Sequence, residues 1–244
     1  MLSRLQSTTN TSGERVILCG PVQLPIKVAG ETVLFQWYAW LKHPGLPENP
    51  EDLLRVLPTL PLAKFQQSSV LTYGDFRAAD VAKVRIHSIC HTGDVFGSQR
   101  CDCGSQLTRA FEQIVEQGAG GVVYVADHEG RGIGLFSKAM TYVMQENGLD
   151  TAEANLRLGH PLDSRSYADV AAVLRMLRTR PIVLLSNNPL KFDELQAHGI
   201  DIGGVESLFG TVSEHNLSYL QTKKMQFLHS LGLLVDPEHG EARL

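Results

Sequence analysis

The chain has 244 residues, a hydrophobic content of 43%, a charged content of 20% and a net charge of −4. These values are typical of a soluble globular protein and argue against a general nucleic-acid-binding surface. No apolar run is long enough for a membrane span, and the polar start contains no apolar signal core. We therefore expect a disordered tail over residues 1–14, no membrane partner and a cytoplasmic protein.

The first third of the chain is β-rich. Its segments of β-branched and aromatic residues predict strands at 15–20, 31–40, 68–75 and 81–88. Cys19 is expected to be a small buried side chain. Five prolines over 43–64 predict an insertion with one short helix near Glu51–Val56, because proline is poorly tolerated inside helices and strands.

Helices and strands alternate through the rest of the chain. The helices are expected at 105–118, 135–148, 150–159, 166–178, 187–199 and 218–231, and the strands at 121–127, 181–186 and 200–202. This order predicts a mixed α/β (α+β) fold: a single domain over 15–231, with a flexible tail at 232–244.

Lys138 and Tyr142 are four residues apart in one of these helices, so they share a face. The apolar stripe of the same helix contains Leu135, Phe136, Ala139, Met140, Val143 and Met144. The simplest interpretation of Lys138 and Tyr142 is a solvated pair on the opposite side.

Three of the four cysteines lie close together, at Cys90, Cys101 and Cys103. Thiolates at this density bind a borderline metal, and zinc is the best match. Three protein ligands leave a fourth position for water, as in a catalytic zinc site, and Gly104 would let the backbone bend after the cysteines. A buried thiol cluster, or a structural zinc completed by His87 or His91, would also fit the spacing. A disulfide is less favoured, because nothing indicates secretion.

Three other motifs have both a functional and a structural interpretation. The glycine-rich segment 128–134, with Arg131, is either a phosphate-binding loop or an ordinary turn. Asp163 and Arg165 precede a helix, where they form either a site pair or a cap with a surface charge. Ser186 and Lys191 follow a strand, either as ligand-binding residues or as part of a turn.

Together, segments 85–107, 129–167 and 184–200 resemble GTP cyclohydrolase II, the zinc enzyme at the start of riboflavin synthesis, in order and spacing. The resemblance covers about residues 15–231. It implies zinc on the three clustered cysteines, Mg²⁺ on a GTP substrate, and a homodimer. In that homodimer we expect the insertion to lie near the zinc site without forming it. The second enzyme half of fused members is not expected, because the leader is too short.

The resemblance also implies roles for individual residues. The implied catalytic residues are Tyr142, Asp163 and Arg165. The implied nucleotide contacts are Arg85, Ile86, His87, Ser88, Ile89, Gln106, Glu129, Gly130, Arg131, Thr151, Ser186 and Lys191. In the family's reaction a zinc-bound water attacks C8 of GTP, and formate and diphosphate leave. Arg165 would act either as a nucleophile or by stabilising phosphate charge.

The chain departs from the family at the pocket. Ile89 stands where the family usually has Glu, which removes a hydrogen-bond acceptor. Asp127 stands where a cation is usual, which would place an anion beside the pocket, although His128 could offset it at low pH. Ser186, where Thr is usual, keeps the hydroxyl. We therefore expect weaker use of GTP or a different nucleotide.

Three different functions would also be compatible with the sequence. The chain could be an enzyme that stops at the formamide, or a non-catalytic nucleotide-binding regulator. It could also be a structural-zinc nucleic-acid module, although the negative net charge argues against this last function.

Overall fold

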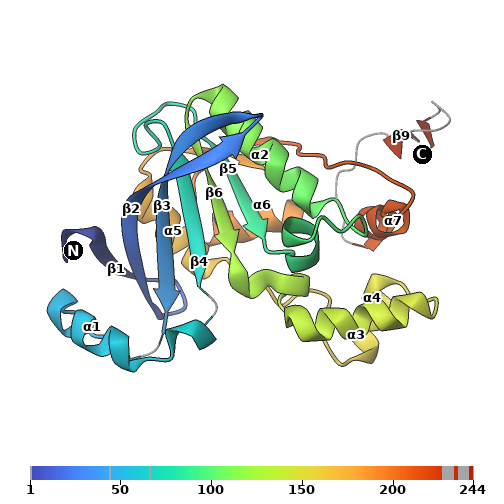
Figure 1. Ribbon diagram of the computed structural model, residues 1–244, viewed down its shortest axis with the longest axis horizontal. Coiled ribbons are helices and arrows are strands. Elements are labelled where there is room, and N and C mark those ends of the chain that lie inside the picture. Colours follow the sequence, from blue (N-terminus) through green and yellow to red (C-terminus); the bar gives the residue numbers. More distant parts are fainter. Residues whose placement is uncertain (1, 44, 66, 227–233, 236–241, 244) are drawn as a thin grey trace.

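One eight-stranded sheet organises the molecule (Figure 1). The computed structural model describes residues 2–43, 45–65, 67–226, 234–235 and 242–243. β1 to β4 and then β6 pair antiparallel, whereas β6, β5, β7 and β8 run parallel, which confirms the mixed fold with a β-rich start. In spatial order the strands are β1 (Leu5–Thr9), β2 (Arg15–Val28), β3 (Glu31–Lys42), β4 (Ser68–Tyr73), β6 (Gly120–Val125), β5 (Lys83–Ser88), β7 (Ile182–Leu185) and β8 (Ile202–Glu206).

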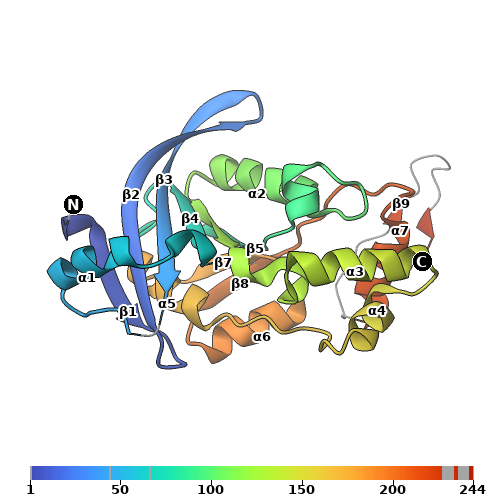
Figure 2. The ribbon, with the colours of Figure 1, turned by 60° about the horizontal axis from the view of Figure 1, so that its bottom comes forward.

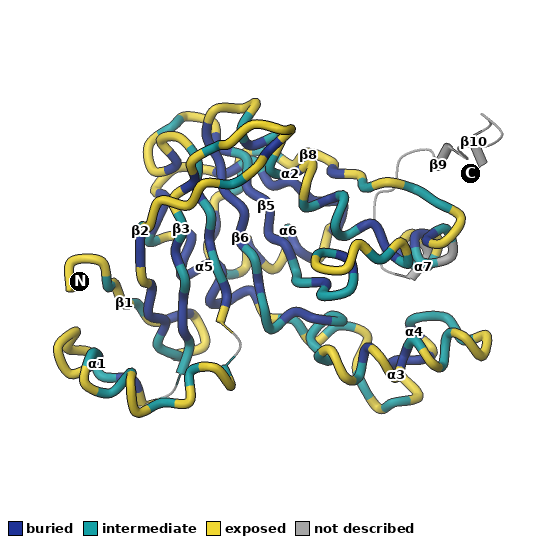
Figure 3. The backbone as a smooth tube through the Cα atoms, viewed as in Figure 1, coloured by how far each residue is buried: buried dark blue, intermediate teal, exposed yellow. Residues whose placement is uncertain are grey.

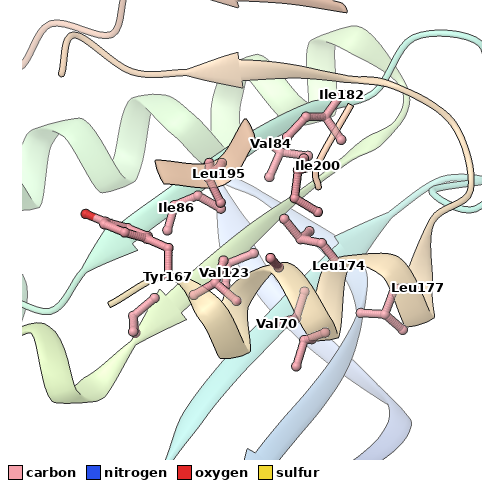
Figure 4. Packing of buried hydrophobic residues seen from close by; sticks show 14 of the residues in the cluster. Val70, Val84, Ile86, Val123, Tyr167, Leu174, Leu177, Ile182, Leu195 and Ile200 are labelled. Atoms are coloured by element: carbon pink, nitrogen blue, oxygen red, sulfur yellow. The ribbon is translucent and has the colours of Figure 1, made fainter. Parts of the chain in front are cut away.

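Helices cover both faces of the sheet (Figure 2). They are α2 (Cys103–Gln117) on one face and α5 (Ala168–Leu177) and α6 (Pro189–Ala197) on the other. β6 separates the two cores, because successive strand residues point to opposite faces: Val122 packs with α2, and Val123 with α5. Figure 4 shows the larger core, where Leu174 of α5 lies among strand side chains such as Val84. Burial is concentrated in these central elements (Figure 3).

α3 (Gly134–Glu146) and α4 (Thr151–Arg157) lie beyond the end of the sheet (Figure 1). The apolar stripe of α3 faces outward: Phe136 is 81% exposed and Val143 60%. Its buried side chains are Lys138 and Thr141. The interpretation of Lys138 as a solvated residue is therefore wrong.

The insertion forms a separate small core against β2 and β3, the long strands near the start of the chain. It contains α1 (Pro50–Val56), followed by two 3-10 turns. Leu46 and Leu53 pack there against Ile17 and Leu41 of β2 and β3. Figure 1 shows α1 on the opposite side of the molecule from α3 and α4. Within one chain the insertion therefore lies away from the cysteines, contrary to expectation, because its leucines are buried against the N-terminal strands.

Two expectations for the first residues are wrong. Residues 5–9 are not disordered but form β1, because backbone hydrogen bonds to β2 order this polar segment. Cys19 is exposed, because Leu18 takes the inward position of the alternating strand.

The C-terminal expectations are only partly covered by the described residues. The last predicted helix is observed as α7 (Leu217–Gln226), and 227–231 lie outside the described residues. Within the predicted flexible tail, β9 (Leu234–Val235) and β10 (Ala242–Arg243) pair, and its other residues are also outside the described ranges. Over the ranges described, no helix has the length and apolar character needed to cross a membrane.

Candidate active site

A cavity opens at the carboxyl ends of β5, β6 and β7, where the loops after three parallel strands converge. The cavity is partly open to solvent, and its free space, counted with that open part, is about 1150 Å³. Helices α2, α3, α4, α6 and α7 also contribute side chains to its wall. Ligands of open α/β sheets usually bind at this end of the strands.

The cysteine loop, residues 89–103, joins β5 to α2 and brings three sulfur atoms within 4.8 Å of one another. Two glycines permit this approach. A Cβ at Gly93 would lie 2.9 Å from the nearest cysteine sulfur, and one at Gly104 would lie 2.6 Å from the Gly93 carbonyl oxygen. Gly104 thus allows close packing in the first turn of α2, rather than the bend expected after the cysteines. The sulfur atoms belong to Cys90, Cys101 and Cys103.

The thiols differ in their tendency to ionise. Hydrogen bonds from Cys101 and Cys103 hold the pKa of Cys90 well below its usual value, and Lys138 Nζ lies 3.1 Å from the Cys90 sulfur. Hydrogen bonding to Cys101 and burial raise the pKa of Cys103. Ionisation of one thiol therefore disfavours ionisation of its neighbours. A coordinated dication removes this conflict, because it deprotonates its thiol ligands. The cluster can hold a metal, and its chemistry fits a three-thiolate zinc site that faces the cavity.

The two histidines considered as a fourth ligand are not part of this cluster. Within the described residues, the three cysteines are the only group of three or more ligand-type side chains close enough to share a metal ion. Buried His87 instead has its Nε2 atom 3.0 Å from Asp94 Oδ2, which also accepts from the Tyr124 hydroxyl and the Cys90 N–H. His87 therefore anchors the cysteine loop through Asp94, in the π-helical turn His91–Val95.

Lys138 of α3 bridges the cysteines and the glycine-rich segment. Its Nζ atom lies 2.7 Å from Glu129 Oε1 and also contacts Cys90. Burial opposes its charge, but these two anions raise the pKa of Lys138, so it stays a cation. Tyr142, one turn later, has its hydroxyl 3.4 Å from Thr92 Oγ1. Burial raises the pKa of Tyr142, so it stays a phenol that can donate a proton.

Basic side chains dominate the described wall of the cavity. Lys191 is buried, and its Nζ donates to the Ile86 carbonyl oxygen at 2.8 Å. Burial and the neighbouring Arg85 and Arg165 lower the pKa of Lys191 well below its usual value. A polyanion would relieve this repulsion, so the pocket suits a phosphate chain. The basic residues are Arg85, Arg100, Arg131, Lys138, Arg165, Lys191 and Lys223, against one acidic residue, Glu129.

Asp163 and Arg165 form a bidentate ion pair. Arg165 Nε lies 2.8 Å from Asp163 Oδ1, and Nη2 contacts Oδ2. Burial raises the pKa of Asp163, but hydrogen bonds from Arg165 outweigh it and the net shift is downward. The pair therefore stays ionised. The helix-cap interpretation is wrong, because α5 begins only at Ala168.

A hydrogen-bond chain continues from Arg165 to His128. Arg165 Nη1 donates to Ser88 Oγ at 3.2 Å, and Ser88 Oγ lies 3.2 Å from His128 Nδ1. His128 Nε2 lies 3.0 Å from the Ser166 carbonyl oxygen, so Nε2 carries the proton and Nδ1 accepts from Ser88. Burial, with help from Arg165, lowers the pKa of His128 to about 3. The expectation that His128 supplies positive charge at low pH is therefore wrong.

Three residues singled out from the sequence lie outside the wall of the cavity. The Ile86 side chain is in the core, and Asp163 is paired with Arg165, which does line the wall. Asp127 lies 3.8 Å from Lys42, so it does not place an anion beside the pocket. The residues that do line the cavity are Arg85, His87, Ser88, Ile89, Gln106, Glu129, Gly130, Arg131, Tyr142, Thr151, Arg165, Ser186 and Lys191, with the three cysteines.

The sequence pattern does not predict several wall residues. Lys138 and Tyr142 share a helix face through their i,i+4 spacing, and Tyr219 and Lys223 in α7 carry the same signal. Asn155 carries no comparable local signal. Four other wall residues, His128, Ile133, Asn187 and Asn188, lie in the two segments that the sequence marks as possible ligand-binding loops. The wall residues that the sequence does not assign to the site are Arg100, Lys138, Thr141, Gln145, Asn155, Tyr219 and Lys223.

Fold and site together define an α/β protein in which a cluster of three thiols that could hold a metal opens onto a cationic pocket. Comparison with known families agrees with that class and narrows it. The chain belongs to the GTP cyclohydrolase II family, whose model matches residues 62–207.

Named proteins from bacteria and archaea are similar to this chain. GTP cyclohydrolase-2 of Streptomyces coelicolor is 47% identical over 161 residues, covering 66% of this chain and 72% of the relative. GTP cyclohydrolase-2 of Archaeoglobus fulgidus is 50% identical over 146 residues, covering 60% and 38%. Riboflavin biosynthesis protein RibBA of Phocaeicola vulgatus is 42% identical over 177 residues, covering 72% and 44%. The matches thus span less than half the length of the latter two.

Proposed function

We propose that this chain is a zinc-dependent GTP cyclohydrolase II. It would open the imidazole ring of GTP with release of formate and diphosphate. The product would be 2,5-diamino-6-ribosylamino-4(3H)-pyrimidinone 5′-phosphate, the first intermediate of riboflavin biosynthesis. The observation that carries this proposal is one cavity lined both by a cluster of three thiols and by a set of arginine and lysine side chains.

The thiol end would serve ring opening. Zinc, when bound by Cys90, Cys101 and Cys103, supplies Lewis acidity that makes water nucleophilic near neutral pH. Lys138 balances the negative charge of the thiolates. Tyr142 is a protonated phenol at the same end of the cavity, so it can give a proton to the opening ring.

The cationic end would serve the triphosphate with its Mg²⁺ ion. Lys191, Arg85 and Arg131 attract the phosphate chain. Arg165 is locked to Asp163 in a charged pair, which makes a neutral, nucleophilic guanidine costly. The pair therefore supports a role for Arg165 in stabilising phosphate charge, with Asp163 orienting it.

The test is to incubate the protein with a panel of purine nucleotides, Zn²⁺ and Mg²⁺, and to quantify formate and diphosphate separately. Equal amounts of both from GTP are expected. Arg165→Ala should lose diphosphate release at least as severely as formate release. Binding of GTP without either product would instead identify a nucleotide-binding regulator.

A second candidate is a paralogue with a shifted nucleotide preference, and Ile89 in the cavity wall favours it. An aliphatic side chain cannot pair with a donor on the base or ribose, and an unpaired buried donor costs about 1–3 kcal/mol. Ile89→Glu should then raise kcat/KM for GTP by roughly 5- to 150-fold. Asp127→Arg, outside the cavity, should leave it unchanged. If Ile89→Glu gives no gain, the departure is compensated elsewhere.

We also propose a homodimer in the cytoplasm, where reduced thiols persist. The exposed apolar face of α3, with Leu135, Phe136, Met140 and Val143, is the surface we assign to the dimer contact. Phe136→Glu should convert the dimer to a monomer in light scattering, with unchanged zinc content. A wild-type monomer at micromolar concentration would reject the assignment.

A further inference from the structure

α7 contributes to the cavity although it lies beyond the segment that the family model matches. The match ends at residue 207, and α7 begins at Leu217. Two of its side chains, Tyr219 and Lys223, nevertheless line the cavity. They are four residues apart and so lie on one face of the helix.

The chain leading to α7 is fixed to the body of the protein. The Leu208 N–H donates to Asn187 Oδ1 at 2.9 Å, and Asn187 Nδ2 donates back to the Leu208 carbonyl oxygen at 2.8 Å. The Thr211 N–H donates to Ser105 Oγ at 2.8 Å. These contacts bring α7 to the N-terminus of α2, where the cysteine loop ends.

Lys223 then holds α7 against the cysteine loop. Its Nζ atom lies 2.7 Å from Asp102 Oδ1, and both side chains are buried, with 9% and 3% exposure. The second oxygen of Asp102 accepts from Gln106 Nε2 at 2.7 Å, and Gln106 Oε1 accepts from Arg85 at 2.7 Å. The charge of Lys223 is therefore matched within the protein, which assigns Lys223 to positioning rather than to direct binding of a ligand.

Tyr219 lines the cavity beside this ion pair. Lys223 Nζ lies 4.5 Å from the centre of the Tyr219 ring, close enough for a cation–π contact. Burial raises the pKa of Tyr219, the Cys103 thiol adds to the rise and Arg131 opposes it. Cys103 and Arg131 line the same cavity as Tyr219 and belong to its thiol end and its cationic end.

We propose that Tyr219 is a further substrate-binding residue and that the Lys223–Asp102 ion pair is its positioning device. The ligand is a purine nucleoside triphosphate, so the inference rests on the proposed function. A tyrosine at a cavity wall offers an aromatic edge for packing and a hydroxyl for one hydrogen bond. α7 thus completes the nucleotide site from outside the family-matched segment.

The test measures Kd for a GTP analogue with a non-hydrolysable αβ bridge, by calorimetry on the zinc-loaded full chain. Tyr219→Ala should weaken binding about 10- to 100-fold, and Tyr219→Phe by less, because the ring is retained. Lys223→Met should weaken binding similarly, and Lys223→Arg should restore much of it. Zinc content should not change in any variant. Lys224→Met is the matched control, because Lys224 is exposed on the same helix.

The double variant Tyr219→Ala with Lys223→Met separates positioning from independent binding. If Lys223 acts through Tyr219, the double variant binds the analogue no more weakly than whichever single variant has the larger Kd. Additive losses would overturn the positioning role. Parent-like Kd for Tyr219→Ala, in a chain that hydrolyses GTP, would overturn the inference and leave the proposed function intact. A parent that neither binds the analogue nor opens GTP would overturn the proposed function itself.

Discussion

α2 and α3 are both amphipathic, yet they bury opposite kinds of side chain. On α2, Ala110 and Ile114 are fully buried against the sheet. On α3, Phe136 is exposed, whereas Lys138 is buried beside a thiol and a carboxylate. An apolar stripe therefore marks the side of a helix that favours burial. It does not say whether the residues that bury it belong to the same chain.

The difference follows from where each helix lies. α2 crosses the face of the sheet, so its apolar stripe meets Val122 and Phe35. α3 lies beyond the sheet and borders the cavity, where the thiols and Glu129 need cationic and hydrogen-bonding partners. Site chemistry thus outweighs hydrophobic burial in setting the rotation of α3.

The largest effect is expected where α2 begins. Cys101→Ser removes one of the three thiolates, so zinc binding and turnover should both be lost, with turnover falling at least about 1,000-fold. Elemental analysis and the formate assay measure the two losses. Cys19→Ser, at an exposed cysteine, is the matched control and should change neither. Full zinc in a variant with all three clustered cysteines changed to serine would contradict the assignment.

The next effect tests the buried face of α3. Lys138→Met leaves Glu129 as a buried carboxylate without its cation, which should cost about 3–5 kcal/mol in the free energy of unfolding. Turnover should also fall, by about 10- to 100-fold, because the thiolates lose a charged neighbour. Met140→Ala, on the exposed side of α3, should do neither when dilute, monomeric protein is measured. Equal effects of both changes in urea unfolding would remove the contrast between the two faces.

Alanine substitution at one apolar position of each helix should give smaller changes in the free energy of unfolding. Ile114→Ala on α2 creates a core cavity and should cost about 2–5 kcal/mol. Phe136→Ala on α3 should cost less than about 0.5 kcal/mol when dilute, monomeric protein is unfolded, since the ring is exposed. If Phe136→Ala proved as costly as Ile114→Ala, α3 would have an intramolecular partner for its stripe.

The most gradual effect is a pH dependence in the segment before α3. His128 has a pKa of about 3 when folded and about 6.5 when unfolded. The unfolded state therefore takes up a proton first, and stability should fall as pH drops from about 6.5 toward 3, by at most about 1.4 kcal/mol per pH unit. His128→Gln should make this acid slope shallower, whereas His215→Gln, at an exposed position, should not. An unchanged slope in His128→Gln would mean that the ring is solvated.

The sequence predicted those features that depend on local pattern. The alternation of strands and helices, the cysteine cluster and the residues after β5, β6 and β7 follow from spacing and from the edge at which parallel strands end. The rotation of α3, the ordering of residues 5–9 and the position of Asp127 depend instead on contacts between distant segments. Tyr219 and Lys223 belong to the same class, because only the approach of α7 to Asp102 gives them a role.

The two ends of the cavity also differ in when they can form as the chain is made. The cysteine ligands span only residues 90–103, so this end can assemble from a short nascent segment. The cationic end needs partners separated by 100 residues for Arg85 and Leu185, and by 105 for Lys191 and Ile86. Metal can therefore be captured while the nucleotide pocket is still incomplete, and zinc added at the start of refolding should accelerate recovery of activity more than zinc added at the end.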